Sequence, residues 1–196
     1  MRTSIIARQT NETNISLELN IDGSGTADIS INCGFLEHML NLFASHGKFD
    51  LKVKCEGDIY VDAHHSAEDL GITLGKAFKE GLGDFRGINR YGHCILPMDE
   101  SLILSAVDLS GRSCCCCSLE GLNEKVGDMD TECIIEFFEA FARNLDAAIH
   151  IKKLDGKNTH HILEGSFKSL ARSLRIACSI DADFKDEIPS TKGCIL

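Results

Sequence analysis

The stretch Asp62-Ala63-His64-His65-Ser66-Ala67-Glu68 has a counterpart late in the chain, Asn158-Thr159-His160-His161-Ile162-Leu163-Glu164. Both contain His-His-x-x-Glu, and both begin a segment in which apolar residues recur at helical spacing. The register continues downstream, where Leu74 corresponds to Leu170. Two such motifs in matching register indicate a duplicated unit that places metal-binding side chains at the start of a helix.

The rest of the chain follows the same duplication. The first half is predicted to contain a hairpin of strands 15–19 and 26–32, a helix 35–45, a strand 51–55 and a helix 63–82. The second half is predicted to contain strands 94–97, 102–109 and 114–117, a polar loop 121–130, a helix 131–143, a strand 147–152 and a helix 159–179. The predicted fold class is α/β (α+β), with duplicated β-β-α-β-α half-domains whose sheets pack against helices. We expect one domain over residues 1–196, made of repeats at about 1–86 and about 87–186 and a tail at 187–196.

Composition narrows the class of protein. The chain has 196 residues, of which 43% are hydrophobic and 26% charged, as in globular proteins. Its net charge of −10 argues against general binding to nucleic acid or to an anionic membrane, but it is compatible with a small anionic substrate. No apolar run approaches the ~20 residues that span a bilayer. The N-terminus lacks the apolar core of a signal peptide, so we expect a cytoplasmic protein.

Ten cysteines are present, and four of them form the run Cys114-Cys115-Cys116-Cys117. This run has neither zinc-finger nor Cys-x-x-Cys spacing. We interpret the cysteines as reduced core residues, and the run as a buried strand in which cysteine takes the place of Val or Tyr.

Helix geometry indicates how the two motifs bind metal. His64 and Glu68 are four residues apart and lie on one helical face, as do their counterparts in the second motif, so each pair can bind one ion. The second histidine of each motif points elsewhere. The sequence therefore predicts two metal sites, each with donors from more than one segment, and leaves open whether those segments belong to one subunit. A single such motif would be explained more simply by surface histidines that bind no metal. The duplication argues against that interpretation.

The residues around the motifs fit this prediction. Asp62 and Asn158 are good helix N-caps. Imidazole and carboxylate donors favour Mn, Fe(II), Co, Ni or Zn over Ca or Mg, and Mn suits an octahedral site. His38 and Glu136, on the helices that precede the two motifs, are candidates to complete the coordination. His46 and His150 are weaker candidates, and we expect His150 to be a core residue or a support for a ligand.

Several basic and hydroxyl side chains are candidates for binding an anion such as phosphate. Arg90, Arg112 and the loop Ser190-Thr191-Lys192-Gly193 lie at strand ends or in loops, and Lys168 lies one turn after Glu164. Arginine binds phosphate through two hydrogen bonds, while the loop offers hydroxyls, backbone N–H groups and a point charge.

These motifs together resemble the imidazoleglycerol-phosphate dehydratase family of histidine biosynthesis, from Asn11-Glu12-Thr13 to Ser190-Thr191-Lys192-Gly193. Besides the two His-His motifs, the matching segments are Leu36-Glu37-His38-Met39-Leu40, Ser45-His46-Gly47, Gly87-Ile88-x-Arg90-Tyr91-Gly92, Pro97-Met98-Asp99-Glu100, Asp108-Leu109-Ser110-Gly111-Arg112 and Phe167-Lys168-x-x-Ala171-Arg172. The resemblance implies a fold like the second domain of ribosomal protein S5, two Mn2+ ions per active site, and trimers assembled into a 24-subunit shell with sites between subunits.

The resemblance also implies roles for residues. The implied metal ligands are His38, His64, His65, Glu68, Glu136, His160, His161 and Glu164. The implied substrate contacts are Glu12, His38, His46, His64, His65, Glu68, Arg90, Asp99, Arg112, His160, His161, Lys168, Ser190, Thr191 and Lys192. The implied catalytic residues are Glu12, Glu68, His65 and His46.

The implied reaction is dehydration of D-erythro-imidazoleglycerol phosphate to imidazoleacetol phosphate. The proton removed is not next to a carbonyl, and an imidazolate held by two manganese ions solves this difficulty, because it can expel the adjacent hydroxyl. Glu12 or Glu68 is expected to move the carbon-bound proton, and a metal-bound water or a histidine to protonate the leaving hydroxyl.

Three features depart from the family pattern. Many members have His where this chain has Glu136, so that either Glu136 or His150 is expected to serve as the ligand. Ala63 and Ser66 stand where Asp and Thr are common, which weakens hydrogen bonding around the ligands. Ser113 and the cysteine run replace a Pro-aromatic segment, which we interpret as a change in packing.

Two other functions share some of these features. A two-metal phosphohydrolase would use the same donors and basic residues, but it would release phosphate. A metal-binding shell protein without catalysis would leave Arg90, Arg112 and the Ser190–Gly193 loop without a purpose.

Overall fold

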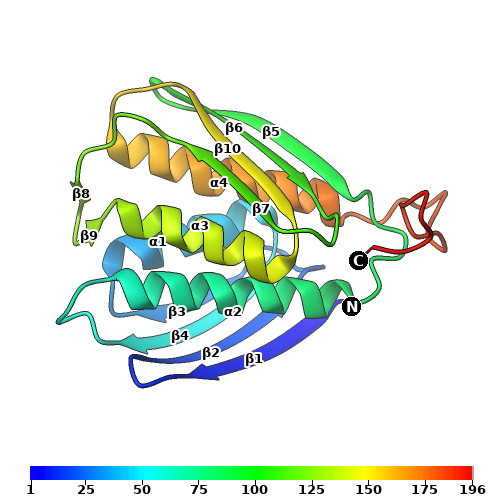
Figure 1. Cartoon of the computed structure of the whole chain (residues 1–196), viewed down its shortest axis with the longest axis horizontal. Coiled ribbons are helices and arrows are strands. Elements are labelled where there is room, and N and C mark those ends of the chain that lie inside the picture. Colours follow the sequence, from blue (N-terminus) through cyan, green and yellow to red (C-terminus); the bar gives the residue numbers. More distant parts are fainter. Residues whose placement is uncertain (196) are drawn as a thin grey trace.

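The computed structural model describes residues 1–195, which form two four-stranded sheets with the α-helices in a layer between them (Figure 1). The first half contains β1 (Thr3–Gln9), β2 (Thr13–Asn20), β3 (Ala27–Ile31), α1 (Gly34–Gly47), β4 (Asp50–Gly57) and α2 (His64–Leu82). The second half contains β5 (Tyr91–Met98), β6 (Ser101–Asp108), β7 (Cys114–Ser118), β8 (Lys125–Val126), β9 (Met129–Asp130), α3 (Glu132–Leu145), β10 (Ala148–Asp155) and α4 (Thr159–Cys178). No helix of the described residues is long and apolar enough to cross a membrane.

The two sheets repeat one topology. The strand order is β1-β2-β4-β3 in the first and β5-β6-β10-β7 in the second, so each strand of one half has a counterpart in the other. In both sheets the third strand of the half pairs in parallel with the strand that follows its helix, and the other pairs are antiparallel. The duplicated α/β fold predicted from the two His-His motifs is confirmed.

The helices pair across the two halves. In α2, a Cβ added to Gly71 would lie 2.5 Å from the carbonyl oxygen of Phe137 in α3, so that these two helices touch through their backbones. The buried rings of Phe43, Phe78 and Phe141, from α1, α2 and α3, lie with centroids between 5.8 and 6.3 Å apart. Likewise, α1 packs against α4. The halves therefore share one core, and a side chain on α1 of the first half reaches α4 of the second.

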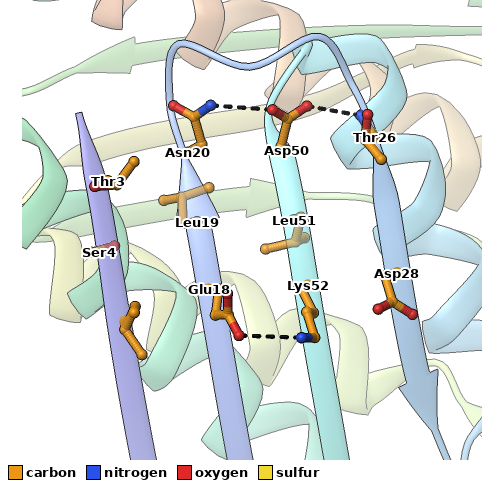
Figure 2. A pocket seen from close by; sticks show the side chains of 11 residues that line it. Thr3, Ser4, Glu18, Leu19, Asn20, Thr26, Asp28, Asp50, Leu51 and Lys52 are labelled. Carbon is orange, nitrogen blue, oxygen red and sulfur yellow. Dashed lines mark hydrogen bonds and ion pairs between the residues drawn. The ribbon is translucent and has the colours of Figure 1, made fainter. Parts of the chain in front are cut away.

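The predicted hairpin of residues 15–19 and 26–32 is wrong. β4 lies between β2 and β3 and pairs with both, as Figure 2 shows. The turn at residues 21–26 passes over the start of β4, where Asp50 Oδ1 accepts hydrogen bonds from the backbone N–H groups of Ser24 at 2.8 Å and Thr26 at 3.0 Å. Those bonds lower the pKa of Asp50 to about 2. The alternation of apolar residues predicted β2 and β3, but it could not show that β4 lies between them.

Other differences concern weakly patterned segments. β1 was not predicted, because at this sheet edge it buries only Ser4 and shows no apolar alternation. The polar loop predicted at residues 121–130 contains the short ribbon of β8 and β9. Ala63, rather than Asp62, is the N-cap of α2, although Asp62 Oδ1 accepts a hydrogen bond from the His64 N–H at 2.8 Å. Asn158 is the predicted N-cap of α4 and accepts from the His161 N–H.

The cysteine run forms a strand, as predicted, but not a buried one. β7 is the edge strand of the second sheet and pairs in parallel with β10 alone. Cys114 and Cys116 are exposed, while Cys115 and Cys117 are half-buried against the core. Four apolar residues in a row predict a strand that is buried on both faces. In the structure only one face of β7 packs against the core, and the other face is exposed.

Candidate metal centre

His38, His160 and Glu164 meet at the start of α4. His160 Nε2 lies 3.2 Å and His38 Nε2 3.5 Å from Glu164 Oε2. His160 and Glu164 come from consecutive turns of α4, and His38 comes from α1, which packs beside it. This arrangement, the Glu164 cluster, confirms the predicted pairing of His160 with Glu164 and brings in His38 from a distant segment.

Glu164 is held as a charged group inside the protein. Its side chain is only 9% exposed, and Lys168 Nζ donates a hydrogen bond to Oε1 from the next turn of the helix. Burial opposes ionisation, but the hydrogen bonds from Lys168 and His160 outweigh it and lower the pKa of Glu164. His46 faces the same region, and burial together with the charge of Lys168 lowers its pKa. A carboxylate that is kept ionised is in the form that binds a metal cation.

The Glu164 cluster fits a metal ion. One donor atom from each residue lies within 4.8 Å of the others, and no other group of three His, Cys, Asp or Glu among residues 1–195 has this geometry. Two imidazoles and one carboxylate form a mixed nitrogen and oxygen donor set without thiolate, which suits Mn, Fe, Co, Ni or Zn. Three protein ligands leave coordination positions open for a substrate.

The first His-His motif forms a second group of donors, the His65 cluster. Asp58, the first residue after β4, lies 3.1 Å from His65 Nδ1, and Glu12, from the turn between β1 and β2, lies 3.7 Å from His65 Nε2. The hydrogen bond with Asp58 raises the pKa of His65. Glu12, for which a role near the reacting groups is predicted, thus lies beside the second histidine of the first motif.

In the second half Glu100, from the turn between β5 and β6, is the carboxylate beside Nδ1 of the second histidine, as Asp58 is in the first half. Glu100 Oε2 lies 2.7 Å from His161 Nδ1, and Oε1 accepts the backbone N–H of Asn158 at 2.8 Å. The hydrogen bond that His161 donates to Glu100 raises the pKa of His161. Asp99 Oδ2 lies 3.7 Å from the opposite ring nitrogen, Nε2. A carboxylate on Nδ1 fixes the tautomer in which Nε2 is free to bind a metal.

Asp58 and Glu100 were not among the predicted site residues. Glu100 lies 61 residues before His161, and no spacing in the sequence connects them. Asp58 is only seven residues before His65, and this carboxylate in the loop leading to the first His-His motif was the one available signal.

Replacing Glu100 by glutamine is expected to weaken Mn2+ binding by about 10- to 100-fold, because a carboxylate that orients a histidine ligand contributes about that much to metal affinity. Titration of the metal-free protein, followed by the electron paramagnetic resonance of free Mn2+, measures the change. Glu120→Gln, at an exposed position, is the matched control. Unchanged affinity in Glu100→Gln would show that His161 needs no partner on Nδ1.

Other predicted ligands are placed differently. Glu68 Oε1 accepts a hydrogen bond from Arg143 of α3 at 3.0 Å, rather than pairing with His64 on its own helix. Glu136 is the fifth residue of α3, as His38 is of α1, so it holds the equivalent position beside α2. His150 is exposed on the outer face of the second sheet, so the expectation of a core or supporting role for it is wrong.

The predicted anion-binding residues lie at the other end of the molecule. Arg90 donates its backbone N–H to the carbonyl of Ala177 and its side chain to the carbonyl of Pro189, both at 2.9 Å, beside the end of α4. Ala177 follows Glu164 by thirteen residues, about 20 Å along a helix. The tail with residues 190–192 emerges at this end, as Figure 1 shows.

Arg112 belongs to the same end. Asp108, the last residue of β6, accepts a hydrogen bond from Arg90 Nε at 2.7 Å, and Arg112 follows it by four residues. Of the predicted phosphate contacts, only Lys168 lies at the metal end. One subunit therefore does not bring the predicted metal ligands and the other predicted anion-binding residues together.

A hollow of about 460 Å³ on the outer face of the first sheet lies apart from both clusters (Figure 2). It is lined by residues of β1, β2, β3 and β4 and contains the ion pair of Lys52 with Glu18 at 3.4 Å. None of the predicted site residues lines it.

Comparison with known proteins identifies the family. The family model described as imidazoleglycerol-phosphate dehydratase matches residues 31–174. A relative of that name from Caldicellulosiruptor bescii is 50% identical over 194 residues, covering 99% of this chain and 98% of its own length. The chain belongs to the imidazoleglycerol-phosphate dehydratase family. Members are hydro-lyases (EC 4.2.1.19) of histidine biosynthesis, and this chain is such an enzyme.

Other members support the assignment over the whole length. The imidazoleglycerol-phosphate dehydratase of Xanthobacter autotrophicus is 49% identical and covers 100% of this chain and 99% of its own. The crystal structure of the Staphylococcus aureus enzyme matches with a TM-score of 0.83 at 35% identity, covering 91% of this chain and 99% of that one. That of the Pyrococcus furiosus enzyme, in complex with (S)-C348, matches with a TM-score of 0.84 at 35% identity, covering 96% and 99%. The resemblance seen in the motifs is confirmed for family and fold.

Proposed function

We propose that the chain dehydrates D-erythro-imidazoleglycerol phosphate to imidazoleacetol phosphate at a site that holds two Mn2+ ions and is completed by a second subunit. The Glu164 cluster carries this proposal. It is a metal-binding group of nitrogen and oxygen donors with open coordination positions, at the start of one of the duplicated helices.

The residues around the two His-His motifs would hold the ions. His38, His160 and Glu164 form one group of donors. Glu136 of α3, at the position equivalent to His38 in α1, would form a second group of donors with His64, His65 and Glu68 of α2. Glu68 would first have to release its hydrogen bond with Arg143. His161, which Glu100 orients, offers its Nε2 to an ion. When bound, the two Mn2+ ions supply Lewis acidity that stabilises negative charge on the imidazole ring of the substrate.

Protein side chains would move the protons. Glu12 is half-exposed and approaches His65 Nε2, so it is suited to take the carbon-bound proton of a substrate between them. Glu68 is the alternative base. The adjacent hydroxyl leaves as water when a histidine such as His65 or His46 supplies a proton. Lys168, paired with Glu164, supplies positive charge near the substrate.

The separation of the two ends supports a shared site. Arg90, Arg112 and Ser190-Thr191-Lys192 would bind the substrate phosphate. These residues lie about 20 Å from Glu164 along α4, too far for one small substrate to span. A neighbouring copy of the chain can place its own anion-binding residues beside the metal end of the first copy. The two copies together would then form one complete site. Trimers assembled into a 24-subunit shell are the closed arrangement that we propose.

A cytoplasmic location is part of the proposal. The ten cysteines are free thiols in the structure, including the exposed pair Cys114 and Cys116. Free exposed thiols suit a reducing compartment.

The test is turnover by the metal-depleted protein before and after addition of Mn2+. We expect activity to require Mn2+, with an ultraviolet-absorbing ketone formed and the phosphate retained on the product. Release of inorganic phosphate without the ketone would instead establish the phosphohydrolase. Gel filtration of the Mn2+-loaded protein accompanies the assay, and a purely monomeric active enzyme would contradict the shared site.

A further inference from the structure

The outer face of the second sheet carries thiols that the dehydratase reaction does not use. In β7, Cys115 and Cys117 pack inward against the core, so Cys114 and Cys116 point outward and are exposed. Their Sγ atoms lie 3.8 Å apart. Two neighbouring thiols on one exposed face form a pair of potential metal ligands.

The spacing of the two sulfur atoms matches one metal ion. Zinc binds thiolate at about 2.3 Å in a tetrahedral site, and two such bonds place the sulfur atoms about 3.8 Å apart. The side chains of Cys114 and Cys116 are two residues apart in a strand, so they share a face, and their present positions already converge to this distance. No backbone rearrangement is needed to bind one ion between them.

His150 supplies a third donor on the same face. In the parallel pairing of β7 with β10, His150 is directly opposite Cys116. Ile149 and Ile151 on either side of it are buried, so His150 points outward and is exposed. Paired strands lie about 4.8 Å apart, and an exposed imidazole is free to rotate toward the sulfur atoms.

We propose that Cys114, Cys116 and His150 form a binding site for a thiophilic cation, with Zn2+ as its ligand and a water molecule in the fourth position. Binding forms two Zn–S bonds and one Zn–N bond and releases the two thiol protons to solvent. Thiolate and imidazole donors select Zn2+ or Cu+ over Mn2+, whereas the Glu164 cluster has no sulfur donor. The two kinds of site therefore differ in the donors that mark a bound metal, which are thiolate sulfur here and only nitrogen and oxygen in the Glu164 cluster.

Cobalt distinguishes this site from the His and carboxylate clusters, because only thiolate ligation produces a near-ultraviolet sulfur-to-cobalt charge-transfer band. The full-length reduced protein, preloaded with Mn2+, is titrated with Co2+ and then with Zn2+ as competitor. The wild-type protein is expected to show the band, and Zn2+ to abolish it. Metal analysis after Zn2+ loading and gel filtration is expected to find one more Zn2+ per chain in the wild-type protein than in Cys114→Ser/Cys116→Ser.

Three variants test the assignment of ligands. Cys114→Ser/Cys116→Ser is expected to lose the band, and His150→Ala to bind Co2+ about tenfold more weakly or worse. Cys194→Ser, which removes an exposed thiol elsewhere, is expected to behave as wild type. Because all the changed side chains are exposed, circular dichroism is expected to show unchanged folding.

Three outcomes would overturn the proposal: absence of the band in the reduced wild-type protein, its persistence in the double cysteine variant, or loss in Cys194→Ser. Unchanged Co2+ affinity in His150→Ala would overturn the assignment of His150.

Discussion

Replacing Glu164 by glutamine is expected to lower dehydratase turnover about a thousandfold or more, equivalent to ~4 kcal/mol of transition-state stabilisation. Glu164 is the one residue of its cluster that contacts both histidines, at 3.2 Å and 3.5 Å, and it also pairs with Lys168. Glutamine keeps the size of the side chain but loses the charge that attracts a cation. The measurements are steady-state turnover at saturating Mn2+ and the Mn2+ content after gel filtration.

The loss of charge at Glu164 also leaves Lys168 buried without its partner, so stability must be separated from metal binding. Glu164→Asp keeps the charge near Lys168 and draws the carboxylate back from the histidines by about one carbon–carbon bond. We expect it to melt near the wild-type temperature yet to retain less Mn2+ than the wild type. Glu120→Gln again serves as the exposed control. Wild-type turnover by Glu164→Gln with full Mn2+ content would remove Glu164 from the site.

Two inactive variants are expected to restore activity when they assemble together. Glu164→Gln damages the metal end, and Arg112→Ala damages the anion-binding end at an exposed side chain. If each site takes its metal end from one subunit and its anion-binding end from another, random co-assembly regenerates about one site in four. Activity of the co-expressed variants, purified through a different tag on each, measures the recovery.

The matched control combines two variants of the same end. Glu164→Gln with His160→Ala cannot form an intact metal end in any arrangement, so this mixture is expected to stay inactive. Mixed oligomers of Glu164→Gln and Arg112→Ala that carry both tags and still lack activity would contradict a site shared between subunits.

Much of the fold followed from local pattern. The four helices and most strands were predicted from apolar spacing, because burial on one side of a helix or strand imposes that spacing. β1 was omitted because an edge strand with one buried residue, Ser4, has no such pattern. The hairpin was wrong because alternation is the same whether β2 pairs with β3 or with β4.

The contacts within the candidate site were also predictable only in part from local spacing. The spacing of four residues between His160 and Glu164 was sufficient to predict their contact, because helix geometry fixes it. His64 and Glu68 have that spacing too, yet Glu68 lies against Arg143 of another helix. A side chain at a helix surface takes the partner that tertiary packing offers.

The sequence by itself determined the duplication and the family, since these depend on which residues recur and at what spacing. The tertiary structure alone decided that His38 joins His160 and Glu164, that Glu100 orients His161, and that the anion-binding residues lie at the far end of α4. The physical reason is that the helices pair between the two halves. Such pairing brings together residues more than a hundred positions apart, and no local pattern records it.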